Sequence, residues 1–378
     1  MQEKAKEPEI RFAGFTGAWE QRKLGDAVQV CSGKDYKHLS EGDIPVYGTG
    51  GYMLSVNDAL SYKDDAVGIG RKGTIDKPFI LKAPFWTVDT LFYAIPKKSF
   101  SLDFIYAIFQ KIDWESKDES TGVPSLSKFT IENCGIVTPG EKEQKSIGEF
   151  FNHIDTLLTL HQRKYEKLLN IKKSMLEKMF PKEGEVVPEI RFKGFTGAWE
   201  QRKLKELATF NPKAEIPDTF EYVDLESVSG SEMTYHRTEN KRSAPSRAQR
   251  VAQKGDLFYQ TVRPYQKNNY LFDKDEYNYV FSTGYAQLRP KVSGVFLLGL
   301  VQSDSFVKTV LNSCTGTSYP AINSNDLSLI EVRSPRIYEE QEKIGSFLAH
   351  LESLLTLHQR KLEMLKNVKQ AFLEKMFV

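Results

Sequence analysis

The residues of this chain whose types and spacing could do chemistry indicate binding more than catalysis. Residues 68–73 (GIGRKG) match the GxGxxG pattern of a dinucleotide site, which requires a helix after the glycines. Residues 74–78 (TIDKP) favour a strand and then a break instead, so we predict a hairpin loop here. Asp103, Glu115 and Lys117 resemble a nuclease metal site only faintly and have no counterpart in the second half, which favours a solvated helix end.

Known catalytic motifs are missing from the sequence. It contains no GxxxxGK[ST] phosphate loop, no Asn-Pro-Pro-Tyr motif of amino methylation and no glycine-rich loop suited to S-adenosylmethionine. Its six histidines suggest no Ser/His/Asp set, and its three cysteines form no CxxC pair, which favours a reducing compartment. We therefore expect a protein that recognises a partner and binds no metal or cofactor itself.

A cluster of basic and amide side chains is the best candidate binding surface. Residues 235–267 carry eight basic residues against two acidic ones, while the whole chain has a net charge of only +2. Arg and Lys neutralise phosphates and read guanine, and Asn and Gln read adenine. For any single residue a solvated surface loop is an equally good interpretation, but the cluster as a whole favours nucleic acid.

The first half has a smaller candidate loop at residues 71–72, where flanking glycines would allow close approach to a groove. The residues predicted to contact DNA are Lys34, Tyr47, Arg71, Lys72, Thr74, Trp86, Arg242, Arg247, Arg250, Arg263, Tyr265, Gln266, Lys267, Asn268, Asn269 and Tyr319.

Two sequence blocks are repeated and must position these loops. Residues 8–24 (PEIRFAGFTGAWEQRKL) recur at 188–204 with one change, Ala13 to Lys193, and we call each copy a box. The sequence LLTLHQRK recurs at 157–164 and 354–361. The segments between the repeated blocks barely match. This pattern indicates a duplicated domain with pseudo-twofold symmetry, in which a shared scaffold holds two unlike surfaces.

Apolar residues spaced seven apart predict two long coiled-coil helices, each up to ~60 Å long. Pro139 and Pro335 precede these helices, and Pro181 ends the first. We interpret His161 and His358, which interrupt the apolar rows at equivalent positions, as polar residues that fix register; a metal site or a pH switch is the alternative. The residues predicted to pack the helices together or to contact a partner are Ile147, Ile154, Leu157, His161, Leu168, Ile344, Leu351, Leu354, His358 and Leu365.

The unlike segments predict a mixed α/β fold. Strands are expected within 44–53, 65–75, 83–95, 255–262 and 279–288, and helices at 102–112 and 294–311. Residues 121–139 parallel 316–335, so the two segments should share a fold and differ in surface. The expected organisation is a first globular domain at 1–140, a helix at 141–180, a linker at 181–187, a second globular domain at 188–336 and a helix at 337–378.

The arrangement resembles the specificity subunit of type I restriction–modification systems over essentially the whole chain. The marks are the two boxes, the closing segments VPSLSK (123–128) and SYPAIN (318–323), and the EQxxIG helix openings at 143–148 and 340–345.

This resemblance implies two target-recognition domains separated by two antiparallel spacer helices. Each domain would read half of an asymmetric double-stranded DNA target, with half-sites ~34–36 Å apart if they lie one helical turn apart. The helices would set the spacing and dock two methyltransferase subunits, which bind S-adenosylmethionine and methylate adenine. Up to two restriction subunits, using ATP and Mg²⁺, would complete the complex.

Three other interpretations remain open from the sequence: a stand-alone DNA-binding or architectural protein, a coiled-coil adaptor that binds proteins, and a nuclease acting alone. No apolar run reaches the length of a membrane span and the start has no signal peptide, so a cytoplasmic bacterial protein is expected.

Overall fold

The computed structural model describes residues 7–316 and 318–378, which divide into two units. Unit 1 holds residues up to 163 together with 359–378, and unit 2 holds 164–358. Each unit contains one box, one of the unlike segments and part of both long helices. The long helices span Glu141–Lys178 (α4) and Tyr338–Lys375 (α9), within three residues of the predicted bounds. Residues 1–6 of the predicted first domain lie outside the described part.

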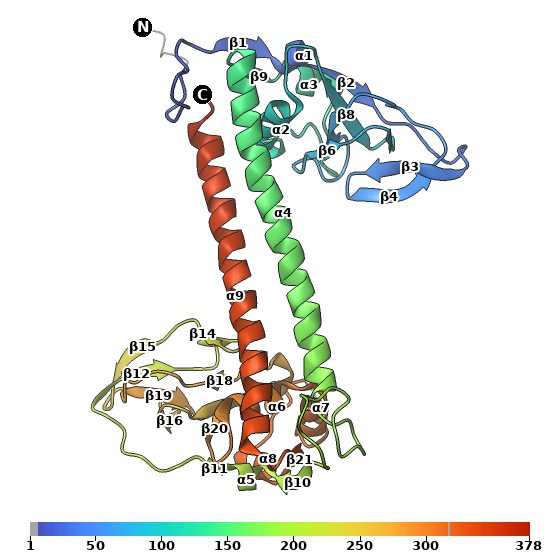
Figure 1. The fold of residues 1–378 in the computed structure, drawn as a ribbon. Helices are drawn as coiled ribbons and strands as arrows, with labels where there is room; N and C mark the ends of the chain where they lie inside the picture. Colours follow the sequence, from blue (N-terminus) through green and yellow to red (C-terminus); the bar gives the residue numbers. More distant parts are fainter. Residues whose placement is uncertain (1–6, 317) are drawn as a thin grey trace. The chain divides into compact units, whose positions relative to one another are not determined.

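Unit 1 is built from short strands and helices around the start of α4 and the end of α9 (Figure 1). Its other elements are β1 (Glu20–Lys23), α1 (Leu24–Ala27), β2 (Val28–Ser32), β3 (Glu41–Gly48), β4 (Gly51–Val56), β5 (Ala66–Gly70), β6 (Phe79–Leu81), β7 (Trp86–Thr87), β8 (Leu91–Pro96), α2 (Leu102–Lys111), η1 (Glu115–Lys117), α3 (Lys128–Asn133) and β9 (Gly135–Thr138).

Unit 2 follows the same plan around the end of α4 and the start of α9. Its other elements are β10 (Glu200–Lys203), α5 (Leu204–Leu207), β11 (Ala208–Phe210), β12 (Thr219–Val223), β13 (Val228–Ser229), β14 (Glu232–Met233), β15 (Arg237–Asn240), β16 (Ala248–Val251), β17 (Leu257–Gln260), η2 (Pro264–Gln266), β18 (Tyr270–Leu271), β19 (Tyr279–Ser282), β20 (Tyr285–Pro290), α6 (Gly294–Gln302), α7 (Asp304–Asn312), α8 (Ser324–Leu329) and β21 (Glu331–Ser334).

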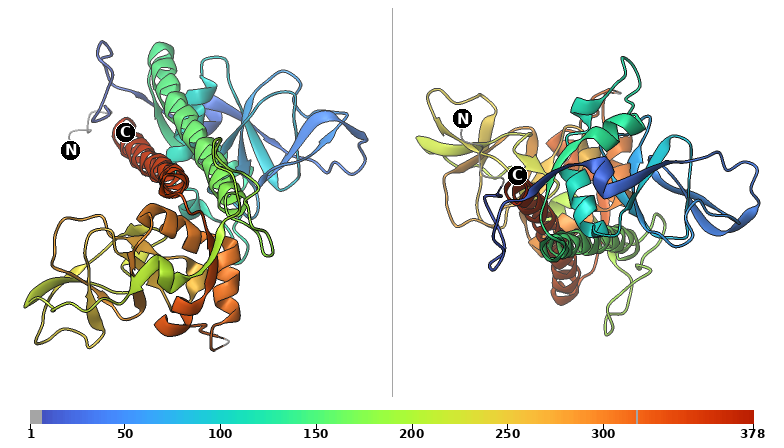
Figure 2. Two further views of the ribbon diagram at one scale, coloured as in Figure 1. Left: turned by 60° about the horizontal axis from the view of Figure 1, so that its bottom comes forward. Right: turned by 90° about the horizontal axis from the view of Figure 1, so that it is seen from above.

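The two unlike segments share a common topology in their two main sheets, as predicted, apart from one extra strand, β16, in unit 2. The first sheet has the order β2-β8-β5-β6 in unit 1 and β11-β20-β17-β18 in unit 2. The second sheet is β4-β3-β7 in unit 1 and β15-β12-β19-β16 in unit 2, and each contains one parallel pair, β3 with β7 and β12 with β19. In each unit the second sheet lies farther from the long helices than the first (Figure 2). Because the pairings match, positions in one unit can be compared with positions in the other.

Each box is clamped to the start of a long helix by an ion pair. In unit 1, the Arg11 guanidinium donates to both carboxylate oxygens of Glu143, at 2.7 and 2.8 Å, and to the carbonyl of Gly17 at 2.7 Å. In unit 2, Arg191 makes the same bonds to Glu340, at 2.7 and 2.9 Å, and to Gly197 at 2.7 Å. Glu143 and Glu340 are buried, and a buried carboxylate needs such a partner.

The glutamines of the two EQxxIG openings also have matched roles. Gln144 donates its amide to the carbonyl of Pro139 at 2.9 Å, and Gln341 to that of Pro335 at 2.8 Å. These bonds hold the chain that enters each helix. The repeated Glu-Gln pair is therefore explained by the packing of the scaffold.

The box also holds the end of the other long helix. The Ile10 amide donates to the carbonyl of Lys375 at 3.0 Å, and the Ile190 amide to that of Lys178 at 2.9 Å. The indole rings of the two boxes pack edge-on against phenylalanines beyond those helix ends, Trp19 on Phe377 and Trp199 on Phe180, both at 6.1 Å. Each box is therefore a packing element that joins the start of one long helix to the end of the other.

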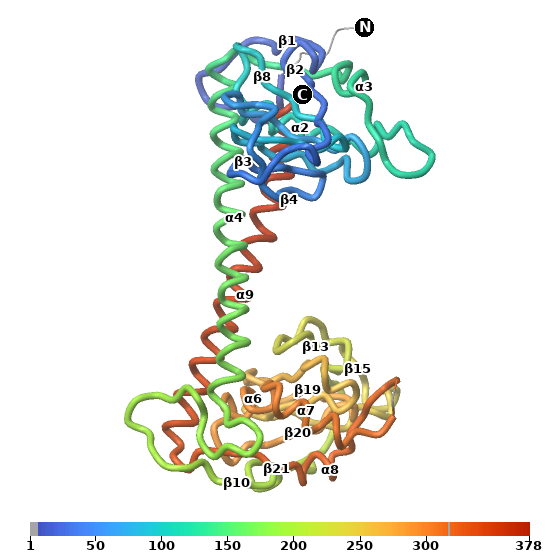
Figure 3. The backbone as a smooth tube through the Cα atoms, turned by 90° about the vertical axis from the view of Figure 1, so that its right-hand side faces the viewer, coloured from blue at the N-terminus to red at the C-terminus, as the bar shows by residue number. Residues whose placement is uncertain are grey.

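The glycines of the EQxxIG openings allow close helix packing. A Cβ at Gly148 would lie 2.8 Å from the Phe104 amide nitrogen, and a Cβ at Gly345 would lie 2.4 Å from that of Phe296. Each long helix therefore contacts the first turn of α2 or α6, where a side chain would not fit. Figure 3 shows α6 and α7 beside the end of α4.

The long helices pack in antiparallel fashion within each unit, and their heptad phase differs from the prediction at Leu157. Ile147, Ile154, Ile344 and Leu351 are buried, and His161, Leu168, Leu354, His358 and Leu365 are half-buried, but Leu157 is 42% exposed. The second apolar row of α4 runs through Phe151 and Leu158, which are seven residues apart. Leu157, predicted to pack on the other helix or on a partner, does not pack between the helices.

Matched ion pairs support the same antiparallel register in both units. Lys369 bonds Asp155 in unit 1, and Lys172 bonds Glu352 in unit 2. In unit 1, Phe372 packs edge-on against Phe150 at 4.9 Å. The ion pair between the helices is thus made twice, once in each unit, whereas Met175 takes the place of Phe372 in unit 2.

The stretch at 294–311, predicted to form one helix, forms two helices in the structure. Residues 294–311 form α6 and α7 with a bend of 66°, because Ser303 ends the first and its hydroxyl caps the second by accepting from the Phe306 amide. No single described helix is long and apolar enough to cross a membrane, and this pair passes that test only together. Phe296, Val301 and Phe306 from the pair are buried in the core of unit 2.

Candidate nucleic-acid interface

In each unit, the loop that follows β5 or β17 is hydrogen-bonded through its backbone to the closing segment, and the bonds are the same in both units. We call this place the loop junction. In unit 1, the Gly73 amide donates to the Pro124 carbonyl at 2.8 Å, and the Leu126 amide donates to that of Arg71 at 2.9 Å.

In unit 2, the Arg263 amide donates to the Pro320 carbonyl at 2.8 Å, and the Ile322 amide to that of Thr261 at 3.0 Å. Isolated bridges at Lys72–Ser125 and Val262–Ala321 complete the match. The predicted basic loops of the two halves therefore occupy one equivalent site, with Gly73 equivalent to Arg263.

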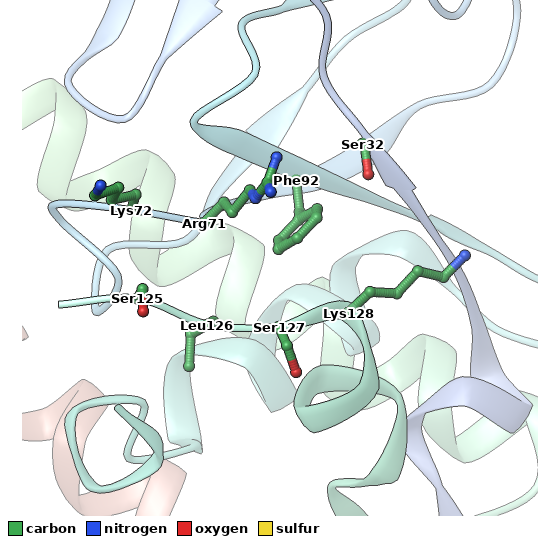
Figure 4. A pocket seen from close by; sticks show the side chains of 8 residues that line it. All are labelled: Ser32, Arg71, Lys72, Phe92, Ser125, Leu126, Ser127 and Lys128. Carbon is green, nitrogen blue, oxygen red and sulfur yellow. The ribbon is translucent and has the colours of Figure 1, made fainter. Parts of the chain in front are cut away.

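The junction of unit 1 borders a basic hollow of about 490 Å³. The Arg71 guanidinium lies 5.7 Å from the centre of the Phe92 ring, beside which Lys128 extends from the closing segment (Figure 4). Ser32, Lys72, Ser125, Leu126 and Ser127 also line the hollow. The basic and hydroxyl side chains suit an anionic or polar ligand. Sequence reasoning found Arg71 and Lys72 but missed Lys128 and the serines, although VPSLSK stood out as a repeated closing segment.

The other predicted contact residues of unit 1 have different environments. Lys34 is exposed, and Tyr47 and Thr74 are half-buried. Trp86 is only 4% exposed, packs with Val46 and Val88 in a small core, and donates its indole N–H to the Lys34 carbonyl at 2.9 Å. The structure thus corrects the prediction for Trp86, whose side chain is part of the core.

The junction of unit 2 presents an arginine stacked on a tyrosine. The Arg263 guanidinium lies 4.5 Å from the centre of the Tyr319 ring, which is 63% exposed. The backbone of Arg263 is left-handed, with φ 53°, and so is that of Lys267, with φ 56°. Each such residue costs about 1–3 kcal/mol unless its surroundings hold it in place. Tyr265 and Gln266 are exposed beside them.

Buried amides hold this loop from below. Asn269, 1% exposed, accepts the Gln260 backbone N–H at 2.9 Å, and the Gln260 side chain donates to the Val262 carbonyl at 2.7 Å. The Gln302 amide donates to the carbonyl of Lys267 at 3.0 Å.

These contacts change the roles expected of the asparagines. Asn269 supports the loop and does not reach solvent, so its prediction as a base-contacting residue is corrected. Asn268 is half-buried, and its side-chain oxygen accepts the Gly230 N–H at 2.9 Å. Gln266 accepts from the Gln260 amide at 2.8 Å while remaining exposed.

The basic cluster of unit 2 divides between two ends of a sheet. The Thr283 amide donates to the Arg247 carbonyl, and the next residue, Gly284, accepts from the Thr261 amide, so Arg247 lies at the junction end. The Lys241 amide instead donates to Asp218, just before β12 begins, which places the neighbouring Arg242 at the opposite end.

Several cations of the cluster are already paired. Lys267 bonds Asp304, Lys254 bonds Asp275, and Arg237 bonds Asp224 and Glu239. Arg250 is half-buried, and burial lowers the pKa of its guanidinium. Among the described residues, Arg263 has no recorded carboxylate partner. The accessible cations at the junction end are thus Arg247 and Arg263.

A metal-binding cluster is absent from the described residues. Over 7–316 and 318–378, no group of three His, Cys, Asp or Glu side chains could hold a metal ion. The predicted hairpin is present, because β5 ends at Gly70 and leads to antiparallel β6, but β6 begins at Phe79 and the strand expected at residues 74–75 is not formed. The geometry presents binding surfaces built on a repeated framework.

Comparison with known proteins identifies the family. The family model described as type I restriction modification DNA specificity domain matches this chain twice, at residues 17–170 and 197–367. This chain belongs to that family. The two matches correspond to the two copies of box, unlike segment and helix.

Similar proteins agree along the whole length. The type I restriction enzyme MjaVIII specificity subunit of Methanocaldococcus jannaschii is 22% identical, covering 93% of this chain and 90% of its own. The EcoDI specificity subunit of Escherichia coli is 21% identical, covering 95% and 88%. The crystal structure of the type I restriction–modification S subunit from M. genitalium shares the fold, with a TM-score of 0.66, 13% identity and coverage of 98% and 99%.

The chain is therefore a type I specificity subunit with two repeated recognition domains, as the sequence resemblance predicted. Specificity subunits are the non-catalytic, DNA-binding components of such systems. This assignment decides against the three other interpretations of the sequence.

Proposed function

We propose that each unit reads one half of a bipartite, asymmetric DNA target through its loop junction. The observation that carries this proposal is the identical backbone framework around unlike side chains: Gly73 with Arg71 in one unit, Arg263 with Tyr319 in the other. One framework suggests one docking geometry on the duplex. Unlike side chains then suit two different half-site sequences.

The repeated scaffold supports a second part of the proposal, that two modification subunits dock on it. Equivalent surfaces on one chain can bind two copies of one partner with pseudo-twofold symmetry. Leu160 and Leu357 are equivalent positions of α4 and α9, and each is 45% exposed. We place S-adenosylmethionine in those partners, and ATP and Mg²⁺ in up to two restriction subunits. In this chain, the helices set the spacing between half-sites.

Replacing a recognition segment tests the first part. Residues 205–335 would be exchanged for the corresponding segment of another specificity subunit, with both boxes and helices unchanged. The variant would be co-expressed with its modification subunits, and methylated motifs would be mapped across the host genome. We expect one half-site to change while the other half and the spacer stay constant. A change in both halves would contradict independent reading by the units.

A further inference from the structure

We propose that Arg263, stacked on Tyr319, reads a guanine in the half-site of unit 2. This inference rests on the proposed function and names the residue and the base. Among the described residues, the guanidinium has no carboxylate partner, and the ring beneath it is exposed. An arginine that only stabilised the fold would be expected to pair with a carboxylate, as Arg191 does with Glu340.

The stacking prepares the arginine for a base edge. The Arg263 guanidinium lies over the Tyr319 ring, 4.5 Å from its centre. A guanidinium that stacks on an aromatic face can still donate hydrogen bonds from its N–H edge. Guanine offers two adjacent acceptors, O6 and N7, in the major groove, and the planar fork of arginine fits both. A phosphate contact needs no such fixed orientation.

The backbone at this position shows that the side chain is held there at a cost. Arg263 has φ 53°, and the equivalent residue of unit 1 is Gly73, with φ +99°. Glycine takes this conformation without strain, whereas arginine does not. A strained residue in an over-determined loop is typical of functional sites.

The loop beneath is rigid enough for base reading. Buried Asn269, Gln260 and Gln302 bond its backbone, and the closing segment bonds the Arg263 amide. Base discrimination requires side chains held on such support. Asn269, which the sequence indicated as an adenine reader, instead supports the loop that carries Arg263.

The test uses the full chain in complex with its modification subunits. The probe is a pool of DNA duplexes with randomised sequence, from which bound duplexes are selected and sequenced. Arg263→Lys keeps the charge but loses the fork. We expect it to lose preference for one guanine in the half-site of unit 2 by about 10- to 100-fold, with the rest of the motif unchanged.

Two further variants separate reading from folding. Arg263→Gly relieves the backbone strain, so we expect the same loss of preference with unchanged or higher thermal stability. Tyr319→Phe keeps the ring and should keep the motif, whereas Tyr319→Ala should weaken preference at the same guanine. Lys254→Gln, which breaks an exposed pair with Asp275, is the matched control and should change nothing in the motif.

Three outcomes would overturn the proposal. Arg263→Lys and Arg263→Gly could leave the motif unchanged while Arg263→Gly weakens binding to all sequences and lowers its salt dependence, which would identify a phosphate contact. The half-site of unit 2 could contain no guanine. The wild-type complex could select no bipartite motif at all, and only that result would also contradict the proposed function.

Discussion

The two units differ at one equivalent position in a way that separates fold from function. Gly73 and Arg263 both have a left-handed backbone, and both donate their amide to the proline carbonyl of the closing segment. The framework therefore demands this conformation, whichever residue fills it. Glycine meets the demand freely, whereas arginine loses about 1–3 kcal/mol. In unit 2 this loss of stability is accepted at Arg263, whose side chain we propose contacts DNA.

The boxes show the opposite behaviour, because side chains and backbone repeat together. The Arg11–Glu143 and Arg191–Glu340 bonds differ by no more than 0.1 Å between units. Copied side chains thus mark packing within the scaffold, and uncopied ones mark the reading surface. This distinction can be tested by changing the two classes separately.

The largest expected effect comes from lengthening the copied helices. One heptad inserted after Arg163 in α4 and another after His358 in α9 adds about 10 Å, or about three base pairs of duplex. We expect the mapped motif to gain spacer length and keep its half-site sequences. Insertion into one helix alone should abolish methylation, because α4 and α9 would then differ in length and the two boxes could not each hold both helix ends. Changed half-site letters at constant spacing would contradict the role of the helices.

The second largest effect should come from breaking the ion pair that joins each box to the start of a long helix. Glu143→Ala and Glu340→Ala each leave a half-buried arginine without its partner, which should cost about 3 kcal/mol in the unit concerned. Glu340 also accepts the Trp199 indole N–H at 3.3 Å, whereas the buried Trp19 indole has no such bond in unit 1. Glu340→Ala should therefore cost about 1 kcal/mol more than Glu143→Ala. Hydrogen exchange in urea, followed on peptides of each unit, measures both.

Glu339→Ala is the matched control for the clamp. Glu339 is exposed and pairs with Lys343 one helical turn away, so its loss should change stability little. If Glu340→Ala behaved like this control, the ion pair would not hold the box.

Much of the architecture was predictable because the sequence is written twice. The repeats correctly predicted the scaffold, the ends of α4 and α9, and a common fold for the unlike segments. Periodicity alone did not show which of two adjacent apolar residues packs between the helices: Leu158 is half-buried there, whereas Leu157 is exposed. Ser303 carried a capping signal within an apolar stretch, which the single predicted helix overlooked.

The contact residues were harder to predict than the fold. Residue type indicated Trp86 and Asn269, but their burial depends on strand pairings and loop bonds that no local pattern shows. Arg242 and Arg247 are five residues apart in the sequence and lie at opposite ends of one sheet. The composition of residues 235–267 did not show that several of their cations are paired with carboxylates, and only the strand register places Arg247 and Arg263 at the junction end.

The smallest expected effect comes from the helix glycines, and it compares the two copies of one contact. Gly345→Ala brings a Cβ to 2.4 Å from the Phe296 nitrogen, against 2.8 Å from that of Phe104 for Gly148→Ala. Overpacking costs about 1–3 kcal/mol, partly offset by up to about 1 kcal/mol of helix propensity. We therefore expect a net loss of about 1–2 kcal/mol in unit 2 and less in unit 1.

The same exchange measurement resolves the two glycine variants by unit, with Gly135→Ala as control, since a Cβ at Gly135 meets nothing within 4 Å. An equal loss in both units would mean that the two helix contacts are equally tight. A gain in either would mean that α2 or α6 yields, and that the repeated glycine reflects something other than packing. The order of the stability losses of Gly345→Ala, Gly148→Ala and Gly135→Ala therefore shows whether the repeated helix contact is equally tight in both units.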